Sequence, residues 1–289
     1  MAFNDEFIPE LWAGKILDNF PANFAFNNMV NRDYEGEISG FGNTVNIAQF
    51  GPVTTKPYTS GATLAAPEQV KVQKTQLKID QQDYFNVMCD DVKKVQSKLN
   101  LLDGATKEAS IAFAKKTNEY VSGIMAAAGK AVAGTKTEPV HVTRDNIGQL
   151  LTDAMVYLDE NDIPLEDRRI VIPPVMQGLL LNSPAFTIST DATDKRVASG
   201  KVYEGYGFKI EVANNLPTFK HHTSHTGFQV IATHPSCTTY AEQILEVESD
   251  RPYNMFSDIV KGLHVYGGLV TRPQGVAVLN LTVDPNEAA

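Results

Sequence analysis

Cysteine, tryptophan and positive charge are all scarce in this sequence. The 289 residues include one tryptophan and two cysteines, Cys89 and Cys237, which are too far apart to form a metal-ligand motif or a disulfide framework. We therefore expect free, buried thiols in a reducing compartment. Acidic residues outnumber basic ones by 34 to 25, and the formal net charge is −9. A surface that grips nucleic acid needs clustered lysine and arginine, so this charge balance argues against one.

Long apolar runs and a secretory signal are also missing. No run approaches the roughly 20 apolar residues of a membrane span. The stretch MAFNDEFIPELWAGK has acidic residues where a secretory signal has basic ones, so we expect neither a membrane span nor a cleaved signal. Hydrophobic residues make up 43% of the chain and charged residues 20%. This composition suits one large domain or two closely joined ones.

The motifs of common catalytic and cofactor sites are absent too. GIMAAAGKA, residues 123–131, departs from a phosphate loop in its spacing and in its place at a helix end. GYGFK and GFGN lack the third glycine of a dinucleotide fingerprint, and no nucleophile elbow occurs. His264 and Tyr266 share a strand face in DIVKGLHVYGGLVTRP, but no nucleophile or third partner can be assigned to them. We expect no enzyme activity and no cofactor.

Hydrophobic periodicity predicts one long helix followed by an alternating α/β region. Asp103 is a candidate N-cap and Gly129 a candidate stop for a helix of about 25 residues, or roughly 38 Å. Further helices are predicted at 147–158 and in VMQGLLL. The strands predicted in the same layer are RRIVIPP, GFKIEVANNLP, FQVIATHP and CTTYAEQILEVE.

The C-terminal segment predicts a β-hairpin. Successive side chains of a strand point to opposite faces. One face would carry Leu263, Val265 and Leu269, and the other would carry His264, Tyr266 and Val270. RPQG has proline and glycine where a type I turn favours them, and VAVLNLTV would be the partner strand.

A long connection between two early strands is the least self-sufficient part of the sequence. Residues 44–50 and 69–80 alternate as strands, with a phase change between Gln73 and Gln76 that predicts a bulge or a twist. The residues between the strands are rich in proline and show no periodic pattern. Because a lone two-stranded ribbon is marginal in water, we expect it to lie on another subunit. An ordinary mobile surface loop is the alternative.

The order of several segments resembles a known family. FIPELWAGKIL, NRDYEGEI, FGNTVNI, AEQILEVESDRP and DIVKGLHVYGGLVTRP together resemble the Hong Kong 97 type of major capsid protein from tailed bacteriophages. The resemblance runs from about residue 7 to 280 and depends on the set of segments. It implies an α+β fold with four regions: an N-arm (1–43), an E-loop (44–80), a P domain with a long spine helix (81–139 and 251–289) and an A domain (140–250).

The resemblance also implies what the chain does. Family members assemble through pentamers and hexamers into an icosahedral head that encloses double-stranded DNA, so the chain would reside in the virion after assembly in the host cytoplasm. The implied partners are other copies, a separate scaffolding protein, a portal protein at one vertex and DNA that is contacted weakly and without sequence specificity. No membrane, cofactor or metal is implied. The E-loop would contact a neighbouring subunit through Phe50, Pro52, Lys56, Tyr58, Leu64 and Pro67, and the N-arm would make contacts through Leu11, Trp12, Phe20 and Phe24.

Two alternatives stay open at this point. The first is the shell subunit of a cellular nanocompartment with the same fold, because a fold does not determine what a shell contains. The second is a metal-dependent enzyme that uses the histidines of HHTSHTG, which are His221, His222 and His225.

Overall fold

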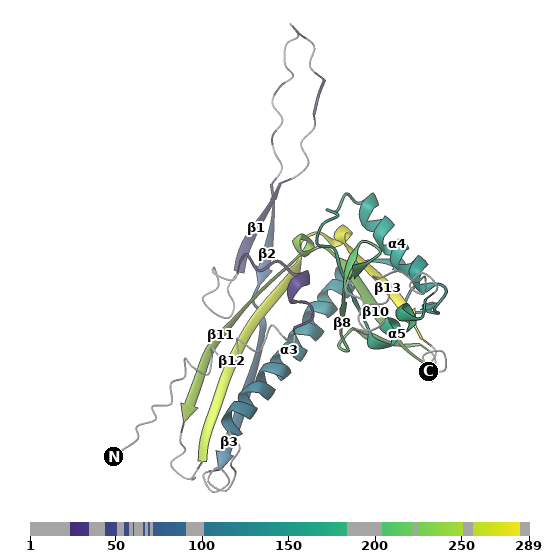
Figure 1. The fold of residues 1–289 in the computed structure, drawn as a ribbon. Helices are drawn as coiled ribbons and strands as arrows, with labels where there is room; N and C mark the ends of the chain where they lie inside the picture. The colour runs from purple at the N-terminus through teal and green to yellow at the C-terminus, as the bar shows by residue number, and fades with distance from the viewer. Residues whose placement is uncertain are drawn as a thin grey trace.

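Two β-sheets and one long helix make up most of the structure, which is a computed structural model. It describes residues 24–34, 44–50, 55–57, 60, 66, 69, 72–90, 101–183, 204–221, 225–250 and 257–283. In Figure 1 the helix α3 runs beside three long strands, and a second sheet with α4 and α5 lies at one end of them. Within these described residues, no helix is long and apolar enough to span a membrane.

The long helix α3 (Leu101–Ala128) confirms the predicted spine. It begins two residues before Asp103, so the prediction that Asp103 caps it is wrong. The helix ends where Gly129 was expected to stop it, and a Cβ at this glycine would lie 2.7 Å from Val278 Cγ2. Phe113, Val121 and Met125 of the predicted stripe are buried. The stripe also buries polar side chains that periodicity did not indicate: Ser110, Thr117, Asn118 and Ser122.

The first large sheet is antiparallel and has three strands in the order β11-β12-β3. Its strands are β3 (Gln81–Asp90), β11 (Thr238–Asp250) and β12 (Ser257–Val270). The alternation predicted for β12 is confirmed, because His264 and Tyr266 face α3 whereas Val265 packs on the opposite face. On that opposite face lies a two-stranded ribbon made of β1 (Thr44–Phe50) and β2 (Val72–Lys78). We call this pair the ribbon.

The second sheet has eight strands and contains most of the main core. Its central order is β4-β13-β10-β6-β8-β7, with β5 added to β13 and β9 added to β10. The strands are β4 (Lys130–Ala133), β5 (Val140–His141), β6 (Arg169–Ile172), β7 (Glu204–Gly205), β8 (Phe208–Val212), β9 (Thr218–His221), β10 (His225–Thr233) and β13 (Val276–Thr282). The helices α4 (Ile147–Glu160) and α5 (Pro174–Leu181) confirm the two further helices predicted in this region.

Two predictions about strand pairing are wrong. β13 does not form a hairpin with β12; it pairs with β10 and β4 in the other sheet, after a short 3-10 turn at Pro273–Gly275. CTTYAEQILEVE, predicted to complete the α/β layer, instead supplies β11 of the three-stranded sheet. For the phase change in the second ribbon strand a bulge or a twist was predicted; the register of β1 with β2 is continuous, so there is no bulge, and exposed Val72 and buried Leu77 lie on opposite faces of β2. Partner choice depends on contacts distant in sequence, so local alternation could not determine it.

Replacing glycine with alanine should have opposite effects on the free energy of unfolding at two positions. A Cβ at Gly267 of β12 would lie 2.2 Å from the Lys78 carbonyl oxygen, so Gly267→Ala must displace the ribbon's backbone. We expect it to lower the free energy of unfolding by about 2 kcal/mol or more. Gly123 of α3 is exposed and a Cβ there meets nothing within 4 Å, so Gly123→Ala should raise the free energy by about 0.5–1 kcal/mol. Chemical denaturation of the unassembled subunits measures both, and equal effects would contradict the packing described.

Candidate functional site

Three side chains, from the N-terminal segment, β11 and β12, converge on the carboxylate of Glu242. Glu242 of β11 is 8% exposed, and its Oε2 accepts a hydrogen bond from the Tyr240 hydroxyl at 2.7 Å. Nε2 of His264 lies 3.1 Å from the same oxygen. The other oxygen, Oε1, pairs with the Arg32 guanidinium, which comes from the N-terminal segment. Three donors around one buried carboxylate form a structural hydrogen-bond network.

Burial keeps His264 neutral under ordinary conditions. Desolvation lowers its pKa from 6.5 to about 4, with Asp83 opposing the change and Arg32 adding to it. The neutral ring donates from Nε2 to Glu242, and it also stacks on Tyr266 with ring centroids 4.9 Å apart. Burial likewise raises the pKa of Tyr266, whose hydroxyl donates to Asp83 Oδ2 at 2.7 Å. The hydrogen bonds and the ring stacking join these side chains to one another and to Glu242 and Asp83.

The lowered pKa predicts an acid-sensitive subunit. Between pH 6.5 and about 4 the unfolded chain binds a proton at His264 that the folded chain does not bind, so stability falls as the pH falls through this window. The full shift corresponds to about 3 kcal/mol. Chemical denaturation of wild type and His264→Gln at a series of pH values measures the difference between them. A difference that stays constant from pH 7 to pH 4 would contradict the prediction.

The opposite face of the three-stranded sheet is covered over part of its length by the ribbon. Val45 and Ile47 of β1 and Leu77 and Ile79 of the β2 segment form a small buried cluster with Ala241 and Val265 of the sheet. This cluster is separate from the main core, so the ribbon is packed on the body by a small hydrophobic contact of its own.

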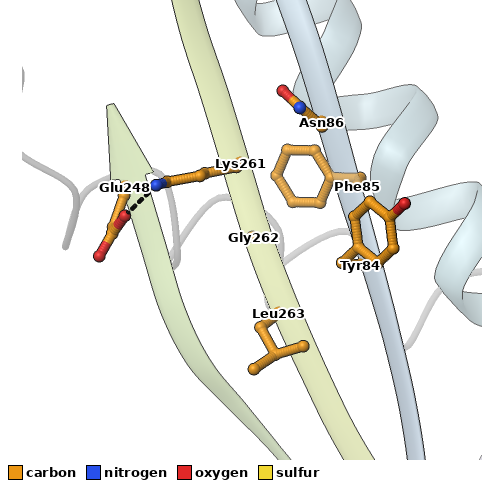
Figure 2. Close-up of a pocket in the computed structure, with 7 residues that line it drawn as sticks. All are labelled: Tyr84, Phe85, Asn86, Glu248, Lys261, Gly262 and Leu263. Atoms are coloured by element: carbon orange, nitrogen blue, oxygen red, sulfur yellow. Dashed lines mark ion pairs between the residues drawn. The ribbon is translucent and has the colours of Figure 1, made fainter. Parts of the chain in front are cut away.

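Farther along the same face, no described residue covers the sheet. Tyr84 is 77% exposed and Met88 is 56% exposed, although both are large apolar side chains on β3. Beside them, Lys261 of β12 forms an ion pair with Glu248 of β11 at 2.6 Å. Residues of these three strands line a shallow hollow of about 370 Å³. Figure 2 draws the lining residues as sticks. Exposed apolar groups around an ion pair are typical of a surface that contacts another protein.

The structure describes only some of the predicted contact residues. Lys56 is described and exposed, and Phe50 ends β1. Phe24 is 3% exposed and packs edge-to-face on Tyr240, so its contact is made within its own chain. The others lie outside the described residues and stay predictions: Leu11, Trp12, Phe20, Pro52, Tyr58, Leu64 and Pro67.

The structure describes only some of the cysteines and histidines for which predictions were made. Cys237 is a free buried thiol, as expected, and burial raises its pKa. His221 and His225 are opposite each other across β9 and β10, whereas His222 and the side chain of His225 lie outside the described residues. Over the part of the chain that is described, no group of three or more histidine, cysteine, aspartate or glutamate residues is arranged to hold a metal.

Comparison with known proteins shows the family to which the chain belongs. Residues 74–279 match a protein family described as phage capsid protein. The chain belongs to this family. A solved structure from Mycobacterium phage Che8 is 31% identical, with a TM-score of 0.73, and the match covers 96% of this chain and 98% of that one. This phage capsid protein is therefore a structural component of the virion.

More distant structures show the same fold. The capsid of Ralstonia phage GP4 is 14% identical with a TM-score of 0.67, covering 92% of each chain. A virus-like particle from Pyrococcus furiosus is also 14% identical, with a TM-score of 0.56, covering 93% of this chain and 98% of that one. The α+β fold of Hong Kong 97 type is confirmed. Among curated protein sequences, none matches the chain.

Sequence reasoning missed the Arg32–Glu242 pair and the uncovered sheet face. The two charged residues are separated by 210 positions, and nothing local to either indicates the other. The glycine pair 267–268 was a usable signal, because a Cβ at one glycine would meet the ribbon and a Cβ at the other would meet Ile124 of α3. A strand with glycine on both faces indicates close packing on both sides.

Proposed function

We propose that this major capsid protein assembles through pentamers and hexamers into an icosahedral head that encloses double-stranded DNA. The observation that carries the proposal is the exposure of the segment between β1 and β2. All of its described residues are exposed, namely Thr55, Lys56, Pro57, Ser60, Ala66 and Gln69. A ribbon whose tip, residues 51–71, is exposed at every described residue needs another surface, and identical copies provide one.

The uncovered face of the three-stranded sheet is a suitable receiver for that tip. It carries Tyr84, Met88 and the Lys261–Glu248 pair, and it continues the face on which the subunit's own ribbon already lies. Apolar side chains with a satisfied ion pair can accept an extended peptide. We assign the E-loop contact residues predicted above, including Phe50, Lys56 and those outside the described part, to this role.

The regional division follows the same proposal. We assign residues 1–43 to the N-arm, 44–80 to the E-loop, 81–139 and 251–289 to the P domain, and 140–250 to the A domain. This division follows the role of each region in a shell and does not follow the sheets. The strands β4 and β13 belong to the assigned P domain but pair within the eight-stranded sheet. The strand β11 belongs to the assigned A domain but pairs with β12 of the P domain.

The remaining partners are inferred from the phage capsid family and from the net charge of the chain. We assign assembly to the host cytoplasm, guided by a separate scaffolding protein and completed with a portal at one vertex. The net charge of −9 suits a shell that contacts packaged DNA weakly and without sequence specificity. No catalytic role is proposed, since the buried histidine and tyrosine groups take part in the structural network.

Expression followed by electron microscopy tests the proposal. The chain is produced alone and together with the scaffolding protein encoded nearest to it, and the products are separated by size. Closed shells or rings of five and six subunits are the expected products. Monomers under every condition would contradict the proposal. Shells that contain a cargo enzyme and no portal would instead support the nanocompartment alternative.

A further inference from the structure

Residues 24–34 form a strap that runs from the main core to the base of the ribbon. At its start, Phe24, Phe26, Met29 and Val30 are buried in the main core. The Phe26 N–H donates to Asn118 Oδ1 of α3 at 3.4 Å. At its other end, Tyr34 is partly buried against the small cluster under the ribbon. The strap therefore connects two separate hydrophobic clusters, one large and one small.

Between these ends the strap is held to the edge of β11 by polar contacts. The Asn31 N–H donates to the Thr238 carbonyl at 2.8 Å, and the Asn31 carbonyl accepts from the Tyr240 N–H at 2.9 Å. Immediately after this bridge, Arg32 pairs with Glu242, and we call this ion pair the clasp. Arg32 Nη1 also donates to Asn27 Oδ1 at 2.7 Å, which orients the guanidinium within the strap itself.

Opening the clasp would leave the sheet intact. When Arg32 leaves, Glu242 still accepts from the Tyr240 hydroxyl and from His264, so its carboxylate stays hydrogen-bonded. Arg32 is 27% exposed and can exchange Glu242 for water. The apolar start of the strap has no such substitute and stays buried. The clasp is therefore the contact that can open without disturbing the body of the subunit.

We infer that the Arg32–Glu242 clasp is a positioning device that holds the ribbon in one direction relative to the body, and that its opening lets the ribbon swing on its small cluster. Two features of the structure carry this inference. The ribbon's buried contact is small and separate from the main core, and Tyr34, two residues after Arg32 in the strap, packs against that same contact. The advantage of a movable ribbon rests on the proposed function, since copies in a shell meet neighbours at different angles.

Distance measurements between spin labels in the unassembled subunit test the clasp. One label is placed on the ribbon with Lys74→Cys and the other on α4 with Val156→Cys, both at exposed positions, in a Cys89→Ser background. Labelled chains are diluted into unlabelled ones so that each distance is measured within one subunit. We expect a single narrow distance distribution with Arg32 present. Arg32→Gln should lose the narrow peak, and Arg32→Lys should recover it in part.

The matched control is Lys261→Gln, which breaks the ion pair that Glu248 makes on the same strand β11. This control should keep the narrow peak. Asn27→Ala, which removes an acceptor that orients Arg32, provides a milder variant if Arg32→Gln does not fold, and it should broaden the peak less. An unchanged peak in the Arg32 and Asn27 variants, or equal broadening in the control, would overturn the inference. Since no shell is needed, this result is independent of whether the chain assembles as proposed.

Discussion

A subunit that lacks residues 52–67 is expected to fold and to fail to form closed shells. The described residues of this segment are exposed, and the four ribbon residues of the small cluster, Val45, Ile47, Leu77 and Ile79, lie outside the deletion. The deletion leaves residues 51 and 68–71 between β1 and β2, which is a connection of ordinary length for a β-hairpin. Folding should therefore survive, whereas the contact with a neighbouring subunit is removed.

Circular dichroism and sedimentation measure the two outcomes separately. The deleted subunit should keep the spectrum and the unfolding transition of the wild type, and shells should fall below detection under conditions that assemble the wild type. A matched variant replaces 52–67 with glycine and serine at the same length, which preserves reach but removes the contact side chains. Both variants should fail to assemble. Normal particles from either one would show that the segment's side chains do not hold the shell together.

Replacing Glu242 with alanine should destabilise the subunit by about 3 kcal/mol. Removing a buried carboxylate leaves Arg32, the Tyr240 hydroxyl and His264 without the acceptor they share. Measured costs of breaking a buried ion pair by deleting one partner are about 3–5 kcal/mol. We take the lower end because Arg32 is partly exposed and regains water.

Glu248 on the same strand supplies the control for this change. Its pair with Lys261 is at the surface, so Glu248→Ala should cost less than about 1 kcal/mol. Denaturant titration of the unassembled subunits compares the two variants in the same β11 context. If both substitutions had the same small effect, the convergence of three donors on Glu242 would not be stabilising. A loss of the unfolding transition in the Glu242 variant alone would support the prediction in its strongest form.

Local pattern predicted the parts of this fold that depend on local physics. The spine helix, the amphipathic helix α4 and the two faces of β12 all follow from periodicity, because burial repeats every 3.6 residues in a helix and every two in a strand. The unpatterned segment between the ribbon strands also predicted a part without packing of its own, and its described residues are exposed. The ribbon strands themselves pack on their own sheet through a small cluster, which the sequence did not predict.

Strand partners and the buried ion pair could not be predicted in the same way. RPQG favours a reversal of the chain, but it does not specify which strand the reversed chain will meet, and β13 continues into the second sheet. Arg32 and Glu242 meet because the strap lies along β11, a contact that depends on the whole fold. Phe24 was predicted to make a contact of the N-arm, but an aromatic side chain does not indicate in the sequence which residue it will contact, and the structure shows Tyr240 of the same chain.

A reconstruction of the assembled particle by electron cryomicroscopy tests the ribbon contact most directly. We predict that residues 51–71 of each subunit lie on a neighbouring copy, against the sheet face that carries Tyr84 and Met88. A particle in which those residues pack against their own subunit, with that face open to solvent, would contradict the proposed assembly.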